Sequence, residues 1–149
     1  MIQGSCLCGA VAFEIDGPLS PIQYCHAARC RKASGSAFGS ECAARSADFR
    51  FTRGEDNIAT YEAPPLREPP AYRRDFCRTC GSPLPVPMGE AEFVVIQAGI
   101  LDGDIPARVF CHIFTDQSAG WYEVDDDLRK FEGRPPPEGR VPSNEDMQG

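Results

Sequence analysis

Apolar and polar residues alternate with a period of two along much of the chain. Val11, Phe13 and Ile15 occupy every second position, as in a strand that buries one face. The same pattern predicts further short strands over residues 22–24, 38–43, 49–52, 58–62, 72–76, 93–98 and 109–114. Turn-forming clusters of Gly, Pro and Asp separate these segments, and one short helix or turn is expected over 27–33. We therefore predict a mainly β fold built from antiparallel β-sheets.

The length of the chain fits one domain of this kind. A total of 149 residues is close to the usual size of a single domain, which we place at residues 1–132. Residues 133–149 are rich in Pro, Gly and Glu and contain few apolar side chains. This composition predicts a flexible C-terminal tail.

The net charge of the chain argues against some classes of binding partner. Acidic residues outnumber basic ones by 22 to 15, and the net charge of −7 argues against nucleic acid or an anionic membrane as the partner. No apolar run approaches the roughly 20 residues that a membrane helix needs. No Lys or Arg precedes the mildly apolar residues 5–13, so we expect no secretory signal and predict a cytoplasmic protein.

Cysteine is the residue type that carries candidate chemistry. The chain has eight cysteines, and six of them form three close pairs, which are Cys6/Cys8, Cys25/Cys30 and Cys77/Cys80. Where no export signal is expected, clustered cysteines are more often metal ligands or reactive thiols than disulfides.

The segment from Cys77 to Gly81 looks like a zinc knuckle. Two thiolates in a tight turn can hold one metal ion, and Gly81 accepts the left-handed backbone that such turns often need. A redox dithiol is the alternative for this CxxC, but it normally lies in a βαβ context that the strand pattern does not provide. A second pair of cysteines would complete a tetrahedral four-thiolate site, and either Cys6/Cys8 or Cys25/Cys30 could supply that pair.

The pair Cys25 and Cys30 leaves more alternatives open. Two thiolates do not complete a zinc site, so these cysteines could share a metal with His26, with Cys111 or His112, or with an exogenous ligand. A metal with an open coordination position is the pattern of catalytic zinc. Two free thiols or a reversible disulfide are the other interpretations.

The remaining cysteines and the histidines have simpler interpretations. Cys42 and Cys111 fall inside predicted apolar strands, where a buried free cysteine behaves as a small hydrophobic residue. His112 fits a hydrogen-bonded core histidine. His26 adjoins a candidate ligand and could support it through a hydrogen bond.

Together these motifs resemble the glutathione-dependent formaldehyde-activating enzyme family, also called the CENP-V/GFA domain. The resemblance rests on residues 4–11 around the CxC, on 25–35 around the Cx4C and on 76–84 around the CxxC, in that order. Short segments between residues 112 and 128 resemble the C-terminal part of the family. The family implies a β-rich, Mss4-like fold.

The resemblance also implies two zinc sites. A structural zinc would bind the four matching cysteines, which are Cys6, Cys8, Cys77 and Cys80. A second zinc usually binds a C-H-C-x-x-C block, which begins at Cys25 and ends at Cys30 in this chain, with Ala27 in place of the middle cysteine. Because two of the three expected ligands remain, we expect this second site to be partly occupied or absent.

The family chemistry is the addition of the glutathione thiol to formaldehyde, and such an enzyme is formally a carbon–sulfur lyase. The resemblance implies a small-molecule thiol such as glutathione as the partner, with Cys25 and Cys30 as candidate catalytic residues. Basic side chains near the cysteine pairs could bind ligand carboxylates; they are Arg29, Arg31, Lys32, Arg73, Arg74 and Arg78. The alternative hypothesis, suggested by Ala27, is a catalytically silent zinc-binding module.

Overall fold

The computed structural model describes residues 1–65 and 72–135, which divide into two compact units. The first unit consists of Met1–Pro18 and Ala44–Ile105, and the second consists of Leu19–Ala43 and the chain from Pro106 onward. The second unit is therefore discontinuous in sequence, because most of the first unit is inserted between its two segments. Within the described residues, no helix has the length and apolar character to cross a membrane.

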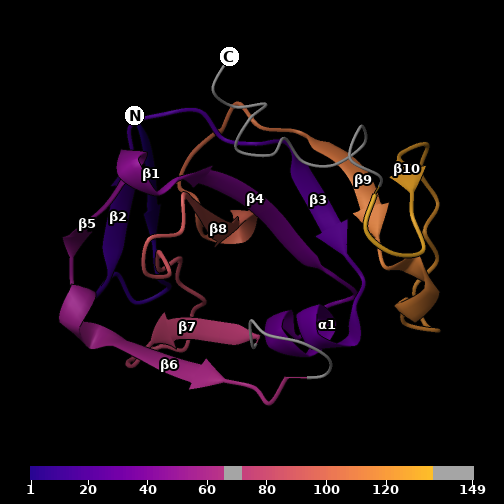
Figure 1. Ribbon diagram of the computed structural model, residues 1–149, viewed down its shortest axis with the longest axis horizontal. Helices are drawn as coiled ribbons and strands as arrows, with labels where there is room; N and C mark the ends of the chain where they lie inside the picture. The colour runs from indigo at the N-terminus through magenta and orange to yellow at the C-terminus, as the bar shows by residue number, and fades with distance from the viewer. Residues whose placement is uncertain (66–71, 136–149) are drawn as a thin grey trace. The chain divides into compact units, whose positions relative to one another are not determined.

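The first unit contains two antiparallel arrangements of strands. Strands β1 (Ile2–Ser5), β2 (Ala12–Ile15) and β5 (Phe49–Arg53) form a sheet in the order β1-β2-β5, while β6 (Ile58–Glu62) pairs with β7 (Arg73–Cys77) (Figure 1). This unit also contains β8 (Phe93–Gln97) and three 3₁₀ turns, η1 (Ser46–Asp48), η2 (Glu55–Asn57) and η3 (Ala98–Ile100). Phe13 packs on Phe49 with ring centroids 5.3 Å apart, and Phe49 packs on Phe51 at 5.0 Å. Burial of these rings stabilises the three-stranded sheet.

A close backbone approach fixes the loop that follows β1. Gly54 has a left-handed φ of 73°, and a Cβ atom at this position would collide with the carbonyl oxygen of Ala10. The neighbouring Arg53 side chain donates a hydrogen bond of 2.8 Å to the carbonyl oxygen of Gly9. Only glycine fits at position 54, and its contact holds the CxC loop against the start of η2.

The second unit is a mixed sheet with one short helix. Its strands are β3 (Ile22–Cys25), β4 (Gly39–Arg45), β9 (Val109–Ile113) and β10 (Arg129–Lys130), in the order β10-β9-β3-β4 (Figure 1). β3 pairs antiparallel with β4 and parallel with β9, and β9 pairs parallel with β10. Helix α1 (Ala28–Ser34) follows β3, and the 3₁₀ turn η4 (Thr115–Gln117) follows β9. Gly35 ends α1 in the left-handed conformation, with its N–H donated to the carbonyl of Arg31.

The predicted mainly β fold is confirmed, and every predicted strand is present with its ends shifted by at most two residues. The helix expected over 27–33 forms over Ala28–Ser34. The pattern did not reveal β1, which includes two polar residues and a glycine, or the two-residue β10. The parallel pairs were not predicted either, because parallel strands are joined by long connections that leave no local signal. Residues 136–149 of the predicted tail lie outside the described residues.

Candidate metal centres and a buried histidine pair

The first unit brings the CxC and the CxxC together. The Sγ atoms of its four cysteines, Cys6, Cys8, Cys77 and Cys80, all lie within 4.8 Å of one another. The Cys6 and Cys8 sulfurs are 3.6 Å apart, and the Cys8 and Cys77 sulfurs are 3.8 Å apart. Tetrahedral zinc with Zn–S bonds of about 2.3 Å has sulfur atoms about 3.8 Å apart. The cluster could therefore hold a metal ion, and its spacing fits four thiolate ligands.

Two similar glycine turns shape this cluster. Gly9 and Gly81 both have φ of 76°, and each donates its N–H to the carbonyl of the first cysteine of its motif, at 2.9 Å for Cys6 and 2.8 Å for Cys77. The Leu7 N–H donates to the Ser82 hydroxyl oxygen at 2.9 Å, which ties one turn to the other. The left-handed glycines reverse the chain within each motif, so both pairs of sulfurs face one point.

Three of the four sulfurs in this cluster lie within hydrogen-bonding distance of nearby donors. The Val11 N–H donates to the Cys6 Sγ at 3.3 Å, and the Asn57 amide donates to the Cys77 Sγ at 3.6 Å. The Ser82 hydroxyl and then the Ser82 N–H donate to the Cys80 sulfur and lower the pKa of Cys80 to about 5. Because thiolates are the metal-binding form, the surroundings of these sulfurs suit metal binding.

The second unit holds a different kind of cluster. Cys25 ends β3, Cys30 lies in α1, and Glu41 lies in β4; their sulfur atoms and one carboxylate oxygen are all within 4.8 Å of one another. The Cys30 Sγ is 3.4 Å from the Glu41 Oε1, and the Gln23 amide donates to the Glu41 Oε2 at 3.2 Å. Both cysteines are buried, and Glu41 is half-buried. Sequence reasoning identified the two cysteines but missed Glu41.

The two cysteines of this cluster have unequal proton affinities. The Cys30 thiol donates to the Cys25 sulfur and lowers the pKa of Cys25. The same contact raises the pKa of Cys30, and burial and the negative charge of Glu41 add to that rise. The cluster thus places two sulfurs and a carboxylate together in an apolar surrounding that includes Cys111 and Ile113. A bound cation would stabilise the deprotonated forms of these ligands.

Other candidate residues have structural partners. Burial raises the pKa of Cys42 and of Cys111 to about 11, in agreement with their interpretation as small hydrophobic residues. Arg31 donates to the backbone carbonyls of His26 and Gln117, at 3.4 and 3.1 Å. Arg73 donates to the Asp75 carboxylate, at 2.9 and 3.1 Å. These two arginines therefore have roles within the fold, although the sequence had suggested them as ligand-binding cations.

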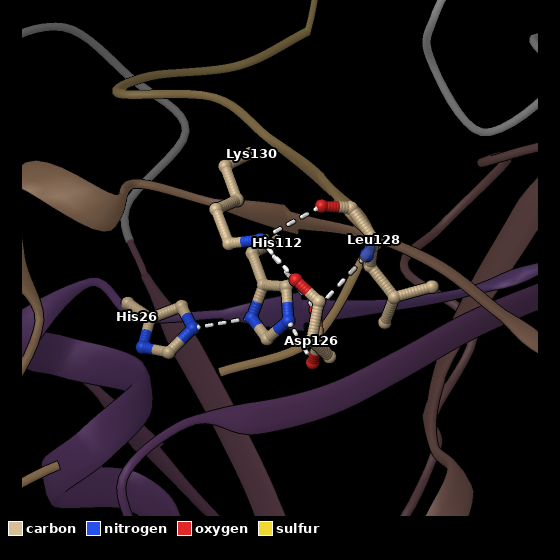
Figure 2. A network of polar contacts seen from close by, with 5 residues as sticks. All are labelled: His26, His112, Asp126, Leu128 and Lys130. Carbon is tan, nitrogen blue, oxygen red and sulfur yellow. Dashed lines mark hydrogen bonds and ion pairs between the residues drawn. The ribbon is translucent and has the colours of Figure 1, made fainter. Parts of the chain in front are cut away.

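The two histidines form a buried chain with Asp126 (Figure 2). His26 and His112 are both fully buried; the His26 Nε2 and the His112 Nδ1 are 2.7 Å apart, and the His112 Nε2 is 2.9 Å from the Asp126 carboxylate. The hydrogen bond from His112 lowers the pKa of Asp126, so this carboxylate accepts the His112 Nε2–H. His112 then accepts at Nδ1 from the His26 Nε2–H. The structure thus confirms His112 as a hydrogen-bonded core histidine.

Asp126 should be a stability determinant, in contrast to its acidic neighbours. Its second carboxylate oxygen accepts from the Leu128 N–H at 3.0 Å, and Lys130 donates to the Asp126 and Leu128 carbonyls (Figure 2). Replacing Asp126 with Ala leaves the buried His112 Nε2–H without its acceptor, and we expect a lower midpoint of urea unfolding. Asp125→Ala is the matched control, since Asp125 is exposed. Equal midpoints for the two variants would show that the histidine chain contributes nothing to stability.

Known proteins share this sequence pattern and fold. The model of the glutathione-dependent formaldehyde-activating enzyme family matches residues 1–117. A curated protein of Halomonas elongata, provisionally named a glutathione-dependent formaldehyde-activating enzyme, is 30% identical over 142 residues, which cover 91% of this chain and 89% of that protein. A structural-genomics crystal structure of a Rhodobacter sphaeroides protein is similar with a TM-score of 0.51 and 26% identity, covering 70% of this chain and 91% of that chain. The chain belongs to the glutathione-dependent formaldehyde-activating enzyme family.

Proposed function

We propose that this protein is a zinc-dependent enzyme of the carbon–sulfur lyase type, acting in the cytoplasm. Its reaction would form or break the adduct between glutathione, or a similar thiol, and a small aldehyde or related electrophile. Family membership supports this reaction class. The observation that carries the proposal is the contrast between a closed cluster of four cysteines and an open cluster with two.

A metal site with a filled coordination sphere is usually structural, whereas a site with a free coordination position can bind a substrate. Four thiolates fill the coordination sphere of zinc, so a metal bound by the cluster of the first unit is structural. The cluster of the second unit offers the Cys25 and Cys30 sulfurs and the Glu41 carboxylate, which leaves one tetrahedral position for a substrate. We therefore assign the chemistry to the second unit.

The reaction needs an activated thiol. The thiol sulfur forms a bond to the aldehyde carbon, and the thiol proton passes to the carbonyl oxygen, which becomes a hydroxyl group. Zinc held by Cys25 and Cys30 would raise the thiolate fraction of a bound thiol, whose pKa is otherwise about 8.5. The apolar side chains beside the two cysteines limit access of water, and the exposed Lys32 of α1 is a cation for the carboxylates of glutathione.

The proposal is tested with protein loaded with zinc to a ratio measured by elemental analysis. We expect the protein to accelerate formation of the adduct from glutathione and formaldehyde by about 100-fold or more over the uncatalysed rate, followed by NMR exchange. Binding of glutathione by calorimetry without any acceleration would contradict this function. That result would favour the silent zinc-binding module to which Ala27 points.

A further inference from the structure

The family resemblance implies a third thiolate for the second zinc site at position 27, where this chain has Ala27. We propose that Glu41 supplies the third protein ligand of this site, and that Gln23 orients its carboxylate. This inference rests on the proposed function only in taking zinc as the metal. It concerns how this chain holds a metal with a sulfur ligand missing.

The geometry places an anionic oxygen beside both sulfurs. One Glu41 carboxylate oxygen lies within 4.8 Å of the Cys25 and Cys30 sulfurs, and its distance to the Cys30 sulfur is 3.4 Å. With Zn–S bonds of about 2.3 Å and Zn–O bonds of about 2.0–2.2 Å, a single ion can contact donors at such separations. Ala27 packs against the apolar cluster to which Cys25 and Cys30 also belong.

Charge is conserved in this exchange of ligands. Zinc with three thiolates carries a formal charge of −1, and zinc with two thiolates and one carboxylate carries the same charge. The carboxylate is a harder ligand than the thiolate it replaces. The site therefore keeps its electrostatic balance while the third ligand comes from β4 instead of from the loop before α1.

Gln23 gives Glu41 a defined orientation. The two residues face each other in the antiparallel register of β3 and β4, and the Gln23 amide donates to the Glu41 Oε2 at 3.2 Å. This bond occupies one carboxylate oxygen and turns the other, Oε1, toward the Cys30 sulfur. A partner that fixes a ligating carboxylate typically changes metal affinity by about 10- to 100-fold.

The other candidate ligands have different contacts. Within residues 1–65 and 72–135, Glu41 is the residue whose donor atom groups with the Cys25 and Cys30 sulfurs. His26 adjoins Cys25 in sequence, but its Nε2 is engaged with His112 and its donor atoms are not part of the group. The sequence had left His26, Cys111 and His112 open as ligands, and the geometry favours Glu41 over all three.

Cobalt binding tests the assignment without an activity assay. We expect the wild-type protein to bind two Co²⁺ ions per chain. Both ions should give thiolate-to-cobalt absorption, and the part that comes from the second site should be lost in Cys25→Ser. Glu41→Gln, which keeps the size and removes the charge, should weaken this second site at least about 100-fold and spare the first. Gln23→Leu should weaken it about 10- to 100-fold. Glu123→Gln, at an exposed position of the second unit, is the matched control and should bind two ions like the wild type.

The double variant Ala27→Cys/Glu41→Gln is the decisive rescue. A third thiolate should restore the second cobalt ion, and the charge-transfer absorption per ion should rise by half as the thiolates increase from two to three. Undiminished cobalt affinity in Glu41→Gln would overturn the inference, and so would a wild-type protein that binds no second ion. A protein that holds both metals as described and shows no turnover would overturn the proposed function alone.

Discussion

Replacing Cys77 with Ser should remove one zinc ion per chain and unfold the first unit. The four sulfurs of its cluster link the loop after β1 to the end of β7, and Cys8 and Cys77 are 69 positions apart. Ordering a loop of this length costs about 4 kcal/mol of chain entropy. Binding of structural zinc contributes on the order of 10 kcal/mol or more, which is comparable to the whole stability of a domain.

Elemental analysis and circular dichroism measure the two parts of this result. Cys42→Ala is the matched control, because Cys42 is also buried but does not belong to either cluster. We expect the control to keep its zinc and a cooperative melting transition. If Cys77→Ser kept both its metal and its melting temperature, the assignment of a structural site to these four cysteines would be wrong.

Cys25→Ser and Cys30→Ser should abolish the formation of the thiol adduct while the first zinc remains bound. Each substitution removes one of the two thiolates that hold the second metal, and a hydroxyl is a poor replacement. We expect the rate with glutathione and formaldehyde to fall by about 100-fold or more, to the uncatalysed level. The melting transition of the first unit should stay near its wild-type temperature, since the closed cluster is separate in sequence.

The matched control for this prediction is Cys111→Ala. Cys111 packs in the same apolar cluster as Cys25 and Cys30, but its sulfur is not grouped with theirs. It should therefore keep the second metal and most of the rate. A rate in Cys25→Ser equal to that of the control would show that the pair does not carry the chemistry.

The strands and the cysteine turns are the features that the sequence predicts well. Period-two alternation locates strands because a half-buried strand alternates its side chains between core and solvent. In β2 the apolar Phe13 and Ile15 are buried as the pattern predicts, while Glu14 between them is also covered and pairs with Arg50. The CxC and CxxC motifs predict metal ligands because two sulfurs in one tight turn converge through local geometry alone. Gly9 and Gly81 adopt the left-handed conformation that such turns require.

Glu41 shows where sequence reasoning stops. It belongs to the predicted strand 38–43, where it precedes Cys42. A charged residue within this mainly apolar strand was the available sign that Glu41 has a specific role. The pairing of β3 with β4 brings Gln23, which is 18 positions away, to Glu41. Cys30, which is 11 positions away, contacts Glu41 from α1. The pairing register of β3 and β4 is a tertiary property, so the sequence pattern could not assign a role to this carboxylate.

Most of the strands, the cysteine turns and the family can be predicted from the sequence alone, because they depend on side-chain period, backbone freedom and short motifs. The tertiary structure decided which cysteine pairs meet, since spacing allowed Cys77/Cys80 to join either of the other pairs. It also decided the histidine chain, in which His26 and His112 are 86 positions apart and meet through the parallel pairing of β3 and β9. Contacts between distant segments follow from how whole strands pack, and no local pattern of residues encodes that packing.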